Sequence, residues 1–214
     1  MEYKLSLVEK LIIEYSDFSV RIEKWELLDS GVNVLWGPSG SGKTSVFRGL
    51  LGLENVKECK WVFGGEDLGR LSPGQKNIGV VFQTYDLFPH MTAYENIQFA
   101  AEAKKVNSTD FENQLNGISK KLRIEHVLNK KAPLLSGGEQ QRVAMARAVV
   151  GKPRMLFLDE PFSALDEELK QESRELVRDF IKEQNIPVLL ITHDKRDVDV
   201  LSDKVFEIKN GQLL

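Results

Sequence analysis

The chain has 214 residues, of which 42% are hydrophobic and 29% are charged, which is long enough to bury a sizeable core. A net charge of −3 gives no support to binding through a basic surface, so we expect no nucleic-acid partner. The one cysteine, Cys59, excludes a disulfide framework within the chain and fits a reducing compartment.

The sequence contains no segment that predicts secretion or membrane insertion. Residues 1–5 lack the basic-then-apolar pattern of a signal peptide. No apolar run approaches the roughly 18 residues needed to cross a bilayer. We therefore expect a cytoplasmic protein that reaches a membrane only by docking onto another protein there.

The first part of the chain predicts strands and one helix. Alternating apolar residues predict strands at 3–8 and 18–22, and an apolar run predicts a strand that ends in a glycine-rich turn at 32–36. A helix is expected at 43–51. Further strands are expected at 60–63 and 78–82.

The hydrophobic pattern changes between about residues 92 and 150, where there is almost no strand signal and helices are expected at 93–105, 110–121 and 139–150. Strands and helices alternate again afterwards, with strands at 155–158, 188–192 and 205–208, a helix at 167–184 and a short final strand. This order predicts an α/β fold with a mainly parallel sheet covered on both faces. The segment from about 92 to 150 is then a helical subdomain inserted into a core formed by 1–91 and 151–214.

A glycine-rich motif follows the strand at 32–36 and fits G-x-x-x-x-G-K-[ST] at every position. Glycines let the backbone wrap closely around phosphates, and the start of the following helix adds a favourable dipole. The lysine supplies a positive charge, and the threonine hydroxyl suits Mg²⁺. The motif and the residue after it are the predicted nucleotide-binding residues: Gly37, Pro38, Ser39, Gly40, Ser41, Gly42, Lys43, Thr44 and Ser45.

Two acids end the apolar strand at 155–158. In proteins with such a phosphate-binding loop, the neighbouring strand delivers an aspartate to the metal, and Asp159 fits that role. Glu160 comes next and is a candidate general base for an attacking water.

A second glycine-rich helix start lies at Ser136, Gly137 and Gly138, followed by Glu139. The serine and the glutamate fit a capping box, which by itself predicts a well-capped helix. Two glycines at a helix start are nevertheless unfavourable, unless bare N–H groups must approach an anion. Because one nucleotide needs only one cradle, we expect the second site to serve a nucleotide held by another copy.

The run 135–142, Leu-Ser-Gly-Gly-Glu-Gln-Gln-Arg, resembles the signature motif of ATP-binding cassette (ABC) ATPases. The other motifs of that family occur in order. Gln83 resembles its Q-loop glutamine, residues 163–166 resemble its D-loop, and His193 resembles its switch histidine. The resemblance covers nearly the whole chain and implies a P-loop NTPase core with an N-terminal antiparallel β subdomain, so that 1–214 form a single ABC ATPase domain.

The resemblance also implies roles for these residues. Lys43 and the loop backbone hold the phosphates of ATP, while Thr44, Gln83 and Asp159 serve Mg²⁺ directly or through water. Glu160 is the general base and His193 contacts the γ-phosphate. The signature residues Ser136, Gly137 and Gly138 close over the nucleotide of a second ABC subunit, identical or paralogous, in a head-to-tail dimer.

An aromatic ring stacks on adenine in this family. Tyr15 lies at a suitable distance before the cradle, and Phe18 is a competitor. Both assignments stay open from the sequence.

The segment 83–99 looks like the region of bacterial importer ATPases that faces integral membrane permease subunits. The implied function is therefore ATP hydrolysis that powers solute import from the inner face of the cell membrane. Features of the signature region also resemble export and lipoprotein-release ATPases. The remaining alternatives are a soluble ABC ATPase that acts on DNA or ribosomes, and a P-loop kinase or GTPase. The chain has one cradle and no heptad tract, which argues against the soluble ABC ATPases.

Overall fold

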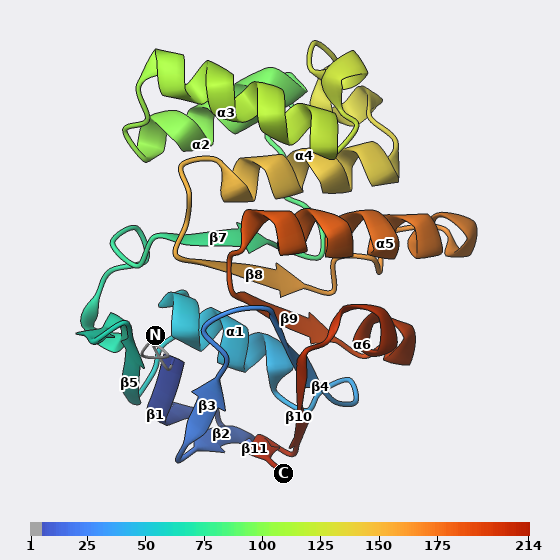
Figure 1. Cartoon of the computed structure of the whole chain (residues 1–214). Coiled ribbons are helices and arrows are strands. Elements are labelled where there is room, and N and C mark those ends of the chain that lie inside the picture. Colours follow the sequence, from blue (N-terminus) through green and yellow to red (C-terminus); the bar gives the residue numbers. More distant parts are fainter. Residues whose placement is uncertain (1–5) are drawn as a thin grey trace.

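A computed structural model describes residues 6–214 of the chain (Figure 1). The first part of the strand predicted at 3–8, and the N-terminal stretch considered as a signal peptide, lie outside the described residues. Across the described range, no helix has both the length and the apolar character required to cross a bilayer.

The centre of the fold is a mainly parallel sheet with the strand order β11-β10-β4-β9-β8-β7. Neighbouring strands from β10 to β7 are parallel, whereas β10 and β11 are antiparallel. The strands are β4 (Val32–Trp36), β7 (Ile78–Val81), β8 (Met155–Asp159), β9 (Val188–Thr192), β10 (Lys204–Lys209) and β11 (Gln212–Leu213).

Every residue of β8 and β9 is buried, so both faces of these central strands are covered, which explains why they appear as continuous apolar runs. Successive side chains of a strand point to opposite faces. In β8, Leu156 and Leu158 join the core beneath the helices, while Met155 and Phe157 join a second core on the other face.

The second core lies between the central sheet and an antiparallel sheet of order β2-β1-β5-β6, with β3 paired to β1. The helix α1 (Lys43–Leu51) packs between the two sheets, where Phe47 contacts Phe157 at 5.2 Å between ring centroids (Figure 1). The strands of this sheet are β1 (Ser6–Glu14), β2 (Ser19–Ile22), β3 (Trp25–Leu27), β5 (Glu58–Phe63) and β6 (Glu66–Asp67).

The remaining helices cover the other face. In Figure 1, α4 lies between the sheet and the pair α2 and α3, and it contacts both β7 and α2. These helices are α2 (Ala93–Ala103), α3 (Ser108–Lys121), α4 (Gly137–Val149), α5 (Glu167–Gln184) and α6 (Lys195–Leu201). Short 3₁₀ helices occur at Leu68–Arg70, Glu125–Val127 and Ala132–Leu134.

The predicted fold class, an α/β P-loop core with an antiparallel β subdomain and an inserted helical subdomain, is confirmed. Several elements differ from the prediction, which did not include the short strands β3 and β6 or the 3₁₀ helices. The first strand was predicted to end at residue 8, but β1 runs on to Glu14. The prediction was too short because a register shift between Val8 and Lys10 interrupts the simple alternation. The seven-residue helix α6 was not predicted, because its charged sequence has no apolar period; its start is capped by Asp194, which accepts a hydrogen bond from the Arg196 N–H.

Candidate nucleotide site

The phosphate-binding loop connects β4 to α1, and glycine is required at several of its positions. Gly40 and Gly42 have φ values of 77° and 103°, in the left-handed region that favours glycine. A Cβ added to Gly37 would lie 2.3 Å from the carbonyl oxygen of Ile208. Gly42 is the N-cap of α1 and provides no side-chain cap, so the first N–H groups of the helix have no side-chain acceptor there.

Lys43, the first residue of α1, is 5% exposed. Its ammonium donates hydrogen bonds to the carbonyl oxygens of Gly37 at 2.8 Å and Pro38 at 2.9 Å. Burial lowers the pKa of Lys43, while the carboxylates of Glu160 and Asp159 oppose that shift. The cation is therefore held inside its own loop, beside two acids.

A cavity of about 450 Å³ opens over this loop, a size typical of small-ligand sites. Gln83 and Glu160 are far apart in the sequence, but both line this cavity together with the loop. The sequence analysis named both as candidate neighbours of a nucleotide. Its lining consists of Phe18, Ser39, Gly40, Gly42, Lys43, Thr44, Ser45, Gln83 and Glu160.

Asp159 ends β8 and is 7% exposed. Burial and the neighbouring Glu160 raise the pKa of Asp159 to about 6, although Lys43 and Arg48 act in the opposite direction. A buried carboxylate with too little positive charge around it fits a divalent cation, which would favour its ionised form. Among residues 6–214 there is no cluster of three or more His, Cys, Asp or Glu side chains suited to a metal.

Glu160 follows directly and adopts a strained backbone conformation with φ of 45°. Its N–H donates to the carbonyl oxygen of Ile191 at 2.9 Å, and its carbonyl accepts from the Ser163 hydroxyl at 2.8 Å. The conformation brings its Oε1 to 2.8 Å from Nδ1 of His193. The carboxylate and the imidazole, 33 positions apart, thus form a hydrogen-bonded pair at the ends of neighbouring strands.

Beneath His193 lies a charged network that the sequence analysis missed. Arg174 is 1% exposed and donates to Asp197 at 2.6 Å and to Asp194 at 2.7 Å. The Thr192 hydroxyl also donates to Asp197, at 2.5 Å. A sequence signal existed, because Arg174 lies on the same stripe of α5 as the buried Val177 and Ile181. A cation on an apolar stripe indicates a buried acidic partner.

The signature segment forms the N-terminus of α4. Ser136 is its N-cap, and the predicted capping box is present: the Ser136 hydroxyl accepts from the Glu139 N–H at 3.3 Å, and the Glu139 carboxylate accepts from the Ser136 N–H at 2.7 Å. Gly137 is exposed and helical. A Cβ added there would meet Leu165 Cδ2 at 3.4 Å, which is an ordinary contact.

Ser136, Gly137 and Gly138 do not line the cavity over the phosphate-binding loop. Within one chain, the two glycine-rich helix starts therefore do not share one cavity. Nothing around Gly137 in the described residues requires a glycine at that position.

Residues 22–163 match the family model described as "ABC transporter". The chain belongs to the ABC transporter family. The family that the motifs suggested is thereby confirmed.

Proteins similar to this ABC chain include ATP-binding proteins named for import. It is 38% identical to the molybdate/tungstate import ATP-binding protein WtpC of Methanocaldococcus jannaschii, over 94% of this chain and 66% of that protein. It is 35% identical to the spermidine/putrescine import ATP-binding protein PotA of Haemophilus influenzae, over 92% of this chain and 52% of the relative. The chain thus spans about half to two thirds of the length of these relatives.

A solved structure supports the fold over the full length of the ABC chain. The protein cbiO1 of Clostridium perfringens, described as part of the ABC transporter complex cbiONQ, superposes with a TM-score of 0.85 and 28% identity. The match covers 100% of this chain and 88% of the other.

The two aromatic candidates for adenine stacking in this ABC chain occupy different positions. Phe18 lines the cavity, and its ring is the neighbour that a Cβ on Gly42 would meet at 3.1 Å. Tyr15 does not line the cavity; it is 42% exposed and its hydroxyl donates to Ser45 Oγ at 3.0 Å. The two rings stack at 6.3 Å between centroids, so they form one aromatic rim beside the cradle.

Proposed function

We propose that this chain binds MgATP and hydrolyses it as one half of a head-to-tail dimer that powers solute import through integral membrane permease subunits. The observation that carries the dimer is Gly137: it is exposed, and within residues 6–214 there is neither a steric nor a conformational need for glycine at this position. A bare helix start of this kind suits close approach of a phosphate from outside the chain.

In the proposed reaction, the loop from Gly37 to Ser45 cradles the phosphates, and Lys43 exchanges its loop carbonyls for phosphate oxygens. Phe18 or Tyr15 forms the adenine platform. Thr44, Gln83 and Asp159 would hold Mg²⁺, which when bound supplies charge neutralisation at the phosphate oxygens.

Glu160 is the proposed general base, because its carboxylate lines the same cavity as Lys43. His193 fixes the orientation of that carboxylate through the 2.8 Å hydrogen bond. The two side chains would hold a water in line with the γ-phosphate, and Glu160 would accept its proton.

The proposed arrangement makes 1–214 a single ABC ATPase domain, with the helical signature subdomain at about 92–150. In the dimer, Ser136, Gly137 and Gly138 of each copy face the nucleotide of the other. The partner copy is either this same chain or a paralogue.

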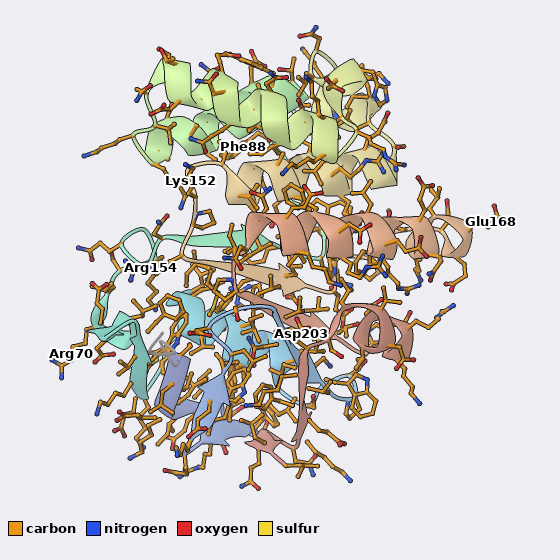
Figure 2. The ribbon with its side chains drawn as sticks, in the orientation of Figure 1. Arg70, Phe88, Lys152, Arg154, Glu168 and Asp203 are labelled. Carbon is orange, nitrogen blue, oxygen red and sulfur yellow. The ribbon has the colours of Figure 1, made fainter. Side chains whose placement is uncertain are left out.

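We place the contact with the permease at the aromatic residues that follow Gln83. One of them, Phe88, is labelled in Figure 2. Phe99 is 47% exposed and packs edge-on against Phe88 at 5.0 Å between ring centroids, and the His90 ring lies 6.2 Å from that of Phe88. We propose import because WtpC and PotA are both named for import. The protein would then be cytoplasmic and peripheral to the inner face of the membrane.

The first test is Glu160→Gln. We expect ATP affinity to stay within a few-fold of wild type while hydrolysis falls by at least about 100-fold, so that ATP accumulates in a stable dimer seen by size-exclusion chromatography. Glu175→Gln on the exposed face of α5 is the control. Unchanged hydrolysis in Glu160→Gln would remove Glu160 from the reaction, and an ATP-loaded monomer would count against the dimer.

Transport is tested by tagging the chain in its native cell, solubilising membranes gently and identifying what is retained. We expect a stoichiometric multi-spanning membrane protein. Recovery without any membrane partner, even after cross-linking, would refute the transport part and leave the ATPase proposal standing.

A further inference from the structure

The carbonyl oxygen of the residue that follows Glu160 receives hydrogen bonds from two distant segments. Pro161 is buried and follows Glu160 directly. Its carbonyl accepts from the Tyr85 hydroxyl at 3.1 Å and from Nε2 of Gln141 at 2.8 Å. Tyr85 lies two residues after Gln83, and Gln141 lies on α4, five residues after Ser136. The Q-loop, the signature helix and the Glu160 turn therefore meet at one oxygen.

Tyr85 is maintained there at a conformational cost. It has φ of 60°, and the next residue, Asp86, has φ of 44°, in the region disfavoured for residues with a Cβ. Arg147 on α4 stabilises this turn by donating to the Tyr85 and Asp86 carbonyls, both at 2.6 Å. A glycine would relieve the backbone but would lose the hydroxyl, so the side chain itself is what this position supplies.

Gln141 is also a costly choice. It is fully buried, and its Oε1 has no hydrogen-bond partner in the described part of the chain. An unsatisfied buried acceptor is unfavourable, and an apolar side chain of similar size would avoid that cost. The retained benefit is the hydrogen bond from Nε2 to Pro161.

We infer that Tyr85 and Gln141 are positioning residues for Glu160, acting jointly through the Pro161 carbonyl. The Glu160 backbone is strained and is held on its N–H side by Ile191. The Tyr85 and Gln141 donors hold the peptide between Pro161 and Phe162, one residue beyond Glu160. The proposed permease contact follows the Q-loop directly in the chain. A movement of the Q-loop would therefore shift the Tyr85 hydroxyl and, through the Pro161 carbonyl, change the orientation of the Glu160 carboxylate. This inference rests on the proposed hydrolysis at Glu160.

The test compares Tyr85→Phe, Gln141→Met and the double variant, measuring kcat, the KM for ATP and stability in urea. We expect each single variant to lower kcat by about fivefold with little change in KM, because nucleotide binding does not involve these groups while the base becomes less well oriented. Either remaining donor still satisfies the carbonyl. The double variant should therefore lose more activity than the product of the two single losses.

Stability separates a positioning role from a structural one. Gln141→Met should unfold at a urea concentration equal to or higher than that of wild type, because it removes an unpaired buried oxygen. Gln114→Met is the matched control: it removes a glutamine side chain that accepts from the Gly151 N–H at 3.0 Å, on α3 away from the cavity. It should leave kcat unchanged.

Wild-type protein that binds ATP but does not hydrolyse it would end the proposed function. Wild-type hydrolysis together with an unchanged kcat in the double variant would instead overturn the positioning role alone. The positioning role would also be overturned if kcat falls only in those variants that unfold at a lower urea concentration than wild type.

Discussion

The two glycine-rich helix starts look alike in the sequence but are built differently. At α1 the glycines shape the backbone: Gly40 and Gly42 adopt left-handed conformations, and Gly42 caps the helix without a side chain. At α4 the cap is a complete capping box, and Gly137 has an ordinary helical conformation. The first site needs glycine in order to fold its own loop. The second site has no such need in the described residues, and we propose that its glycine serves a group that approaches from outside. Glycine is therefore present at the two helix starts for two different physical reasons, which mutations can separate.

The largest expected difference is at Gly42. In Gly42→Ala the φ of 103° becomes strained and the new Cβ meets Val20 and Phe18 at 3.0 and 3.1 Å. We expect a loss of about 1–2 kcal/mol in unfolding free energy and an ATP affinity at least about tenfold weaker. Urea denaturation and titration with a fluorescent ATP analogue measure the two effects. Gly117→Ala, in the middle of α3 with open space around it, is the control and should gain stability.

Gly137→Ala should separate stability from function. Because alanine is the better helix former, the unfolding free energy should stay level or rise by up to about 0.5 kcal/mol. The added methyl group would stand between the helix start and the partner's nucleotide, so ATP-dependent dimerisation and hydrolysis should fall by about tenfold or more. If this variant loses stability as Gly42→Ala does, the two sites do not differ as described. Full activity would remove Gly137 from the second site.

A smaller effect is expected from pH at the signature helix. The hydrogen bond from the Ser136 N–H lowers the pKa of Glu139 below its ordinary value of 4.5, against the opposing effect of burial. A lowered pKa in the folded state stabilises the protein above the unfolded pKa, and that stability is lost as pH falls through the folded value. Glu139→Gln should therefore abolish this part of the acid destabilisation below about pH 4.5, as followed by thermal unfolding between pH 7 and pH 3. An identical pH dependence in the two proteins would show that the carboxylate adds nothing to the cap.

Much of the fold could be predicted because buried parallel strands produce long apolar runs. The predicted strand at 188–192 and helix at 167–184 coincide with β9 and α5. The phosphate-binding loop was equally accessible, because its chemistry depends on consecutive residues. Contacts made across the fold were not predictable in this way. Arg174 contacts Asp197, and Tyr85 and Gln141 contact Pro161. These residues are brought together only by the pairing of β7 with β8 and the packing of α4 and α5. The choice between Tyr15 and Phe18 stays open in the sequence for the same reason, since it depends on how β1 and β2 approach the loop.

The strand order also has a consequence for synthesis on the ribosome. The cradle follows β4, but β4 is flanked by β9 and β10, which are made much later. The N–H of Gly211 donates to the Ser41 carbonyl at 3.0 Å, and the Ile208 carbonyl lies against Gly37. The phosphate-binding loop therefore leaves the ribosome early, but its contacts with residues 208–211 cannot form until about residue 211 has left the exit tunnel. Until then the backbone N–H and C=O groups along both edges of β4 stay unpaired, and its apolar side chains stay uncovered, which is a long interval for a chaperone to protect.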